Sequence, residues 1–326
     1  MSDTRAPIAV ELTRDVVESV HLVDAVVATV DGPVTVWGDA SAPIIPRSAI
    51  KPIQVLPLLR TGAAEAFGVS DIEVSLGAAS HSGQPDHVKA VAAWLERIGY
   101  SSGVLECGPD RPIHVPSADD LLATGLPFAP IHNCCSGKHA GFLTVCRHLG
   151  FDPAGYIQRA HPIQELVTEA IEEFTEVDLS AATNGADGCG IPTFTFPAHR
   201  LAHAMARLVT PAALDEPTAT AAARVVQSMS DHVWWMSGSG RAEDDLATVA
   251  TERIVLKGGA EGVFMASLPA RGIGIALKAR DGAHRAADAA MAAVFAQLGV
   301  VPADAAVSVI TNKAGTVVGE MRGVAA

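Results

Sequence analysis

Strand patterns lie towards both ends of this chain of 326 residues, and helical patterns fill the middle. Five runs have the length and apolar content of strands: 20–30, 33–38, 253–256, 262–268 and 272–279. Asp31-Gly32, between the first two runs, is typical of a tight hairpin turn. Helical periodicity or alanine-rich composition marks four other stretches: 88–98, 163–174, 211–230 and 284–298. We therefore expect an α+β fold, with an antiparallel sheet from both chain ends and helices inserted between its strands.

Length and charge narrow the class of protein further. A chain of 326 residues can bury a large core. No repeat or long linker divides it, so we expect a single domain over residues 1–326, whose two intimate lobes have no clean boundary in the sequence. The 36 acidic and 23 basic residues give a net charge of −13. With no lysine- or arginine-rich run, this balance argues against a nucleic-acid or anionic-membrane partner.

The N-terminal segment and the cysteines predict a cytoplasmic protein. Residues 1–7 lack the apolar stretch of a signal peptide. The apolar run 20–30 is interrupted by His21 and Asp24 and is too short to span a bilayer. The five cysteines lack the spacing of a secreted disulfide scaffold, so reduced thiols are expected.

Ser48-Ala49-Ile50-Lys51 carries the clearest chemical signal, an S-x-x-K tetrad at the start of an expected apolar core helix. The spacing puts the hydroxyl and the amine on one helical face. A serine hydroxyl needs a partner that takes its proton, and a lysine can do so when burial or a neighbouring cation depresses its pKa. Pro52 is tolerated only in a first helical turn, which places Ser48 at the helix start. The alternative interpretation is a solvated lysine beside a helix-start serine.

The segment 132–141 concentrates two imidazoles, two thiols and one amine ahead of an apolar stretch. Adjacent thiols usually point in different directions, so Cys134 and Cys135 are not expected to bind one metal together. A metal would use one of them with Cys189, whose glycine neighbours permit a tight turn. The alternative is that these are ordinary buried thiols. A P-loop is excluded because Gly137-Lys138-His139 lacks the leading glycine and the trailing Ser/Thr.

Two further elements fit a serine hydrolase. Lys257-Gly258-Gly259 ends an expected strand and resembles the K-T-G element of penicillin-recognising enzymes. Ser80 follows an apolar stretch and precedes a helix, a place where hydroxyls line clefts. Each residue also has a simpler interpretation, as a strand-end lysine and a helix-flanking serine. The loop 237–241, after Trp234 and Trp235, is either a lid or a connection.

Four segments together resemble the rhizobial-type (class 3) L-asparaginases: 46–52, 132–139, 184–190 and 257–262. The likeness covers nearly the whole chain in order, and the Cys-Cys-Ser-Gly-Lys-His block is highly specific. The resemblance implies a serine β-lactamase/glutaminase-like fold, a homodimer, and hydrolysis of L-asparagine to L-aspartate and ammonia.

The resemblance also assigns roles to individual residues. It implies one Ser–Lys tandem of Ser48 and Lys51 and a second of Ser80 and Lys257. It implies a zinc site at Cys135, Lys138 and Cys189, with zinc positioning the substrate. The candidates for holding the charged groups of the substrate are these: Arg47, Asn133, His139 and Asp187.

Two other hypotheses stay open at this point. One is a related Ser–Lys amidase, either a glutaminase or a penicillin-recognising hydrolase. Against a true β-lactamase, the chain has neither an S-D-N element nor an obvious deacylating glutamate. The other is a non-enzymatic, zinc-holding protein in which Ser48 and Lys51 are structural.

Overall fold

The computed structural model describes residues 3–324, which divide into two compact units. The first unit comprises the described residues up to Ala49, residues 195–213 and the chain from Asp245 on. The second comprises residues 50–194 and 214–244. Each unit is assembled from separate segments, which explains why no composition shift marks a boundary. No helix within residues 3–324 is both long and apolar enough to cross a lipid bilayer.

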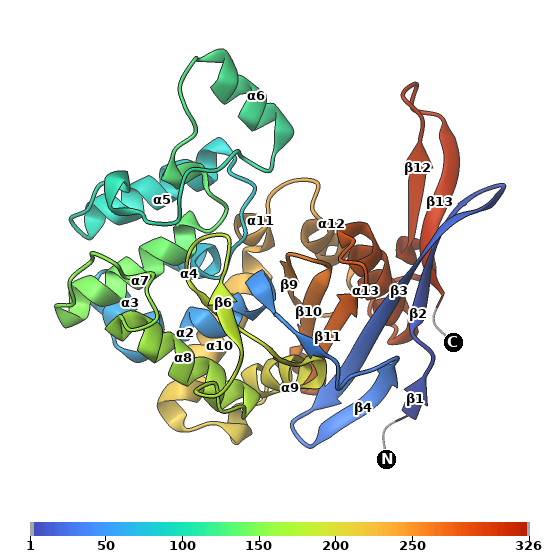
Figure 1. Cartoon of the computed structure of the whole chain (residues 1–326), viewed down its shortest axis with the longest axis horizontal. Coiled ribbons are helices and arrows are strands. Elements are labelled where there is room, and N and C mark those ends of the chain that lie inside the picture. The colour runs from blue at the N-terminus through green and yellow to red at the C-terminus, as the bar shows by residue number, and fades with distance from the viewer. Residues whose placement is uncertain (1–2, 325–326) are drawn as a thin grey trace. The chain divides into compact units, whose positions relative to one another are not determined.

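A nine-stranded sheet forms the framework of the first unit (Figure 1). Its strands are β1 (Asp3–Arg5), β2 (Ile8–Arg14), β3 (Val16–Thr29), β4 (Gly32–Trp37), β9 (Val255–Gly259), β10 (Val263–Leu268), β11 (Ile273–Ala279), β12 (Val307–Thr311) and β13 (Val317–Val324). The main path runs β12-β13-β2-β3-β11-β10-β9 with antiparallel pairing throughout, and β4 pairs with β3 beside it. The expected α+β class, with one sheet built from both chain ends, is confirmed.

Helices cover the sheet where it is most apolar. Both α9 (Ala198–Leu208) and α13 (His284–Gln297) pack against β3, β10 and β11. Every residue of β10 is buried, because neither face of this strand is left open. The Ser267 hydroxyl of β10 donates to the Met205 carbonyl of α9 over 2.9 Å, which identifies the α9 face of that strand.

The remaining elements of the first unit are short. They are β5 (Pro43–Ile44), paired with β8 (Phe196–Pro197), and three 3-10 turns, η4 (Pro211–Ala213), η5 (Pro269–Arg271) and η6 (Ala303–Ala306). The hairpin at Asp31-Gly32 occurs as predicted, and residues 269–271 form a tight connection between β10 and β11. Strands β12 and β13 were not predicted, because most of their residues are partly or fully exposed and form no continuous apolar run.

The second unit is mainly helical. Its helices are α1 (Lys51–Gln54), α2 (Leu56–Arg60), α3 (Ala63–Ala66), α4 (Asp71–Gly77), α5 (Pro85–Arg97), α6 (Val115–Ala123), α7 (Ser136–Leu149), α8 (Pro162–Thr175), α10 (Glu216–Asp231) and α11 (Val233–Met236). Shorter elements are η2 (Ser102–Val104), η3 (Pro130–His132) and the pair β6 (Asn184–Ala186) and β7 (Pro192–Phe194). Helix α12 (Ala242–Val249) contains the last boundary between the units in sequence.

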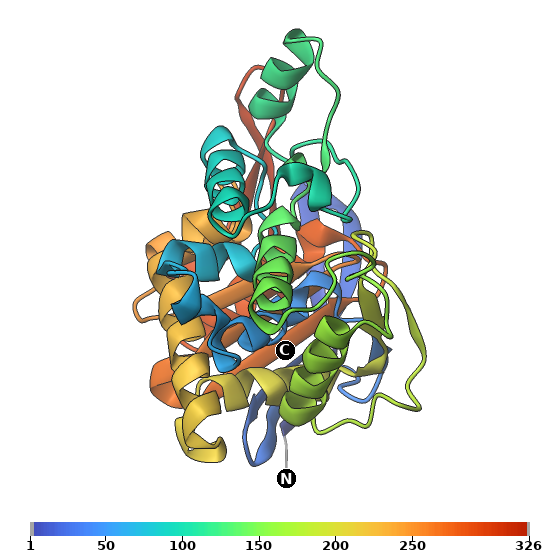
Figure 2. The same cartoon turned by 90° about the vertical axis from the view of Figure 1, so that its left-hand side faces the viewer.

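Helix α7 is the centre of this unit, with α2, α3, α4, α5 and α8 packed around it (Figure 2). All its residues from Ser136 to Cys146 are buried. Four chemically active side chains of the Cys-Cys-Ser-Gly-Lys-His block therefore lie away from bulk water.

In place of the single expected apolar helix, the structure has three short helical segments. Ser48 lies in the 3-10 turn η1 (Arg47–Ile50), and α1 and α2 follow it. The prediction that Ser48 opens an α-helix was therefore wrong in its detail. The physical reason is that each of Pro52 and Pro57 occupies the first turn of a new helix, where its missing N–H is no loss.

Candidate active site

Ser48 lies in a strained turn of the first unit. Ser48 is half-buried in the 3-10 turn η1, directly after Arg47. The Arg47 backbone has φ of 49°, in the left-handed region that non-glycine residues seldom adopt. Such strain persists only where the surroundings hold it, and it concentrates at functional sites.

The strand that carries Lys257 holds this turn in place. A Cβ at Gly259 would lie 2.8 Å from the Pro46 carbonyl oxygen and 3.1 Å from the Ala49 nitrogen, so only glycine lets β9 approach so closely. Lys257, two residues earlier on the same strand face, is fully buried, and its amine donates to the Gly258 carbonyl over 2.6 Å. The first unit thus contributes a serine turn and a buried lysine on the strand that supports it.

In the second unit, Lys51 and Ser80 contact each other directly. Lys51 begins α1 and is fully buried, and its amine lies 2.9 Å from the Ser80 hydroxyl oxygen. The same amine donates to the Ala79 carbonyl over 2.5 Å and contacts the Cys135 sulfur at 3.2 Å. A distance of 2.9 Å permits proton transfer between the amine and the hydroxyl.

Backbone hydrogen bonds fix Ser80 in this position. Helix α4 ends at Gly77, and the chain then extends so that the Ser80 N–H donates to the Met236 carbonyl and the His81 N–H to the Cys134 carbonyl. The His81 ring lies 2.9 Å from the Ser136 hydroxyl. Ser80 is therefore held between the 236 segment and the start of α7.

A second cluster consists of Cys135, Lys138 and Cys189, each no more than 5% exposed. The Lys138 amine donates to the Cys189 sulfur over 3.0 Å. Gly137 makes this arrangement possible, because a Cβ there would lie 2.4 Å from the Leu76 carbonyl oxygen of α4. The first turn of α7 can therefore lie directly against the helix that leads to Ser80.

Charge is distributed unevenly over this cluster. Hydrogen bonds from the Cys134 and Cys189 thiols, helped by the nearby amines of Lys51 and Lys138, hold the pKa of Cys135 well below its usual value. The hydrogen bond to Cys135, together with burial, raises the pKa of Cys189. Burial alone would lower the pKa of Lys138, but Cys189, Cys135 and Asp187 outweigh it and raise that pKa.

This donor set fits a zinc ion. Its two buried sulfurs are ligands that zinc favours, and the buried Lys138 amine lies beside them. The raised pKa of Lys138 beside Cys135 and Cys189 shows that the cluster favours positive charge, and a zinc ion would replace the protons on Lys138 and Cys189. Within residues 3–324, no group of three His, Cys, Asp or Glu side chains could hold a metal, so a site here would need the Lys138 amine as a ligand.

His139 lies beside this cluster and is also fully buried. The Nδ1 atom of His139 lies 2.7 Å from the Tyr156 hydroxyl, which also accepts the Glu106 N–H. Burial holds the pKa of His139 well below its usual value, so the ring is neutral. Its Nε2 has no partner among the described residues, so it is a buried polar atom that a bound molecule could satisfy.

Two other predicted substrate contacts occupy different surroundings. The Asn133 amide donates to the carbonyls of Cys107 and Gly108 and accepts the Cys135 N–H, so this side chain supports the turn before α7. Asp187 is partly exposed at a turn, where its carboxylate accepts the Gly188 N–H over 2.8 Å.

The cysteines outside the cluster have the properties of inert thiols. Burial raises the pKa of both Cys107 and Cys146 to about 12. Cys134 differs, because it is partly exposed and its sulfur lies 3.8 Å from that of Cys135.

The structure brings Lys51, Ser80 and Cys135 together, and separately Lys138 and Cys189. Sequence reasoning missed Tyr156 and the contact between Lys51 and Cys135. One signal for the first was available, since the chain has only two tyrosines. None was available for the second, because it joins residues from distant segments.

Taken together, a buried lysine bonded to a serine hydroxyl, and a second serine three residues before that lysine, define a hydrolase of the Ser–Lys type. The chain belongs to the L-asparaginase II family, whose model matches residues 10–323. Family and site together support an amidohydrolase. No curated protein matches the chain.

Several solved structures are similar to the chain. They are a β-lactamase from Mycobacterium bovis (14% identity, 86% of this chain and 95% of that chain, TM-score 0.42), Mglu in its glutamate form (16%, 86% and 62%, 0.41) and a probable glutaminase from Bacillus subtilis complexed with 6-diazo-5-oxo-L-norleucine (12%, 86% and 85%, 0.37). The expected likeness to β-lactamase and glutaminase structures is thus found. With TM-scores under 0.5, it carries no argument about activity.

Proposed function

We propose that this protein is an L-asparagine amidohydrolase of the rhizobial type, which releases L-aspartate and ammonia through an acyl-enzyme on Ser48. The observation that carries the proposal is the fully buried Lys51 amine, 2.9 Å from the Ser80 hydroxyl and three residues after Ser48. An amide hydrolase needs a nucleophile with a nearby proton acceptor, and this segment provides both.

In the proposed reaction, the Ser48 oxygen attacks the side-chain amide carbon of asparagine and its proton passes to Lys51. The carbon–nitrogen bond then breaks, and Lys51 returns the proton to the departing ammonia. Water attacks the resulting ester, gives a proton to Lys51, and the carbon–oxygen bond to Ser48 breaks to release aspartate. Lys51 passes its proton back to Ser48, so the enzyme is restored.

Ser80 and Lys257 support this proton transfer in the proposal. The Ser80 hydroxyl, bonded to Lys51, relays protons to and from the amine. From the family resemblance, we assign Lys257 with Ser80 to the second Ser–Lys tandem, which takes part in the same proton transfer.

Substrate recognition requires one partner for each charged group of a small zwitterion. We assign the α-carboxylate to Arg47 and the α-ammonium to Asp187. The Nε2 atom of His139 is available to hydrogen-bond the substrate, since it is buried without a partner in the described chain. Asn133 acts through the turn that it supports.

Zinc would be held by Cys135, Lys138 and Cys189. When bound, the ion would supply a fixed positive charge that orders the surrounding side chains. Lys51 contacts Cys135, and Asp187 influences Lys138, so ordering this cluster would position both the base and a substrate ligand. We further propose, from the family resemblance, a homodimer in the cytoplasm.

The decisive experiment measures ammonia released from L-asparagine, from L-glutamine and from a chromogenic β-lactam. We expect release from asparagine, and none from Ser48→Ala protein whose fold is verified by circular dichroism. Exposed Ser308 provides the matched control, Ser308→Ala, which should keep full activity. Turnover of glutamine or the β-lactam instead would favour a related amidase. A Ser48→Ala protein with unchanged activity would overturn the proposal.

A further inference from the structure

The peptide group that joins Ala79 to Ser80 is held at both of its polar atoms. Its carbonyl oxygen accepts from the Lys51 amine over 2.5 Å, and its N–H donates to the Met236 carbonyl over 3.1 Å. The Lys51 amine also lies 2.9 Å from the Ser80 hydroxyl. Because a peptide group is planar and rigid, a shift of Met236 would tilt the group on which the Lys51 amine rests. The distance between the amine and the hydroxyl therefore depends on where residue 236 lies.

The segment 236–239 makes two more hydrogen bonds to the extended chain that follows this peptide group. The Ser82 hydroxyl donates to the Ser237 carbonyl over 2.6 Å. The Ser239 N–H donates to Gln84 Oε1 over 2.9 Å. The two segments are thus joined at three successive places, and two of the three bonds use a side chain of the earlier segment.

Gly238 lets the two segments approach this closely. Its φ is 101°, and a Cβ there would lie 2.6 Å from the Ser82 hydroxyl oxygen and 2.7 Å from Gln84 Oε1. Ser82 and Ser237 are each only 1% exposed, so water has little access to the bond between them. A buried carbonyl that loses its donor is costly, which makes the Ser82 hydroxyl a strong constraint on this segment.

Both ends of the segment are also fixed at the start of α5. The Trp234 ring stacks on the His87 ring, with centroids 4.3 Å apart, and His87 Nε2 lies 3.1 Å from the Trp234 carbonyl oxygen. At the other end, the Ser239 hydroxyl accepts from Trp234 Nε1 over 2.9 Å and from Gln84 Nε2 over 3.3 Å. The start of the loop 237–241 is therefore tied down by named side chains, as a clamp on the segment that carries Ser80.

We propose that Ser82 and Gln84 are positioning residues for the amidohydrolase reaction. They hold the segment 236–239, and the first carbonyl of that segment holds Ser80 against Lys51. The inference rests on the proposed function, because it assigns these side chains a part in proton transfer between Lys51 and Ser80. Side chains that only stabilised the fold would leave the turnover of folded protein unchanged when removed, whereas positioning residues lower it.

Steady-state kinetics on the full chain measures the effect on turnover. Gln84→Met keeps the length of the side chain and removes both of its bonds to Ser239, and Ser82→Ala removes one hydroxyl. In each we expect kcat for ammonia release from L-asparagine to fall about tenfold, with KM within about twofold, because a small misplacement of a catalytic group costs rate. Gln84→Glu keeps an acceptor for the Ser239 N–H and should restore most of kcat. The control is Gln158→Met, the same change at an exposed position of this unit, which should keep parental kinetics.

Amide hydrogen exchange, followed by mass spectrometry, tests the clamp without a substrate. The peptide that contains Ser80 should exchange faster in Gln84→Met and Ser82→Ala than in the parent chain, and at the parental rate in Gln158→Met. Unchanged exchange in both variants, or parental kcat in folded Gln84→Met, would overturn the inference. A parent chain that releases no ammonia from asparagine or glutamine and leaves the β-lactam intact would overturn the proposed function instead. Exchange at Ser80 would still decide whether these two side chains hold the segment.

Discussion

Lys51 and Lys138 are both fully buried in the second unit, yet their surroundings differ. The Lys51 amine contacts a carbonyl, a serine hydroxyl and one sulfur. Lys138 contacts the sulfur of Cys189, and its pKa is raised by two cysteines and Asp187 despite burial. Lys51 has a neighbour with which it can exchange a proton, whereas Lys138 has neighbours that keep it charged.

The difference shows how one side chain type acquires two roles. A buried lysine beside a hydroxyl suits acid–base catalysis, because the proton has a second place to go. A buried lysine near a thiolate balances its charge, and a metal ion can take over that task. Cys135 contacts the first lysine and influences the second, so the two regions are linked through one thiolate.

The largest expected effect is loss of turnover on removing the Lys51 amine. Lys51→Met keeps most of the buried volume, and we expect kcat for asparagine hydrolysis to fall by about 10²–10⁴-fold, the usual contribution of a general base. Lys138→Met should lower kcat less and raise KM more. Steady-state kinetics on both proteins measures the contrast.

The control for this comparison is Lys89→Met, because the Lys89 side chain is 78% exposed in the same unit. It should retain parental kinetics. Equal losses of kcat in Lys51→Met and Lys138→Met would contradict separate roles for the two lysines.

The next effect concerns the thiols of the Lys138 region. Cys135→Ala and Cys189→Ala should each lose bound zinc and raise KM by about 10–100-fold, because the metal positions other groups. Cys107→Ala and Cys146→Ala should keep zinc, since neither thiol belongs to the cluster of Cys135, Lys138 and Cys189. Metal analysis of the four purified proteins measures which of them keep zinc. Full zinc content in Cys189→Ala would exclude this residue as a ligand.

A smaller effect is expected from His81, which follows Ser80 and whose ring lies 2.9 Å from the Ser136 hydroxyl. Burial, helped by His87 and Lys51, lowers the pKa of His81 to about 3 from an ordinary 6.5. Below pH 6.5 the unfolded chain therefore protonates His81, whereas the folded chain does not protonate it until about pH 3. The stability that this difference contributes is fully present above pH 6.5 and is lost as the pH falls from 6.5 to about 3. One such group contributes about 1.4 kcal/mol per pH unit to the slope.

Urea unfolding between pH 6 and pH 4 tests this prediction. In His81→Asn, the slope of the unfolding free energy against pH should decrease by the amount that the uptake of about one proton contributes. The same substitution at exposed His148 is the control. An unchanged slope in His81→Asn would show that His81 is not held neutral in the folded chain.

The sequence indicates candidate residues most directly where chemistry and spacing lie within one short segment. Ser48 and Lys51, and Cys135 and Lys138, are each three residues apart, and their joint roles stay predictions. The strand pattern at both ends predicted the class of fold correctly, because each run is rich in apolar residues. The exposed strands β12 and β13 have no such run and were missed.

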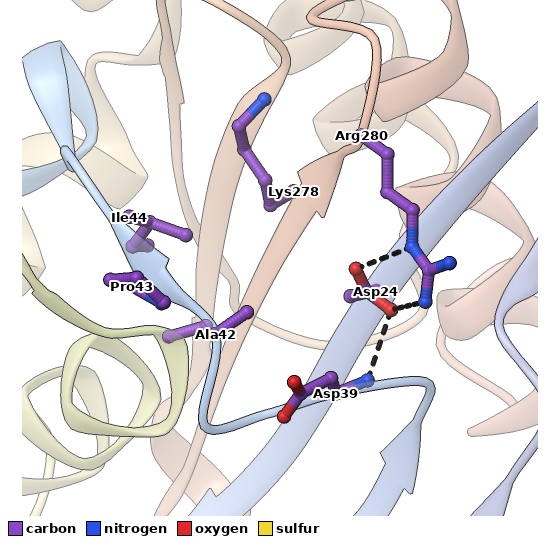
Figure 3. Close-up of a pocket in the computed structure, with 8 residues that line it drawn as sticks. Asp24, Asp39, Ala42, Pro43, Ile44, Lys278 and Arg280 are labelled. Carbon is purple, nitrogen blue, oxygen red and sulfur yellow. Dashed lines mark hydrogen bonds and ion pairs between the residues drawn. The ribbon is translucent and has the colours of Figure 1, made fainter.

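The contacts that join these segments could not be predicted. Lys51 meets Cys135 because Gly137 lets α7 lie against the end of α4, which is a matter of close packing between distant segments. In the first unit, a pocket of about 450 Å³ likewise depends on a bond from Arg280 to Asp24, residues from opposite ends of the chain (Figure 3). Residue type alone does not indicate such pairings.

The smallest expected effect separates loss of stability from loss of chemistry. Asp215 caps α10, where its carboxylate accepts the Thr218 N–H over 2.9 Å. Asp215→Ala leaves that donor without its partner and should reduce the unfolding free energy by about 1 kcal/mol, while kcat and KM stay unchanged. Asp231→Ala, at the other end of the same helix, removes an equal charge without touching the cap. If Asp215→Ala also lowered kcat by orders of magnitude, activity would follow stability throughout this unit, and the losses expected at Lys51 and Lys138 could no longer be assigned to their different partners.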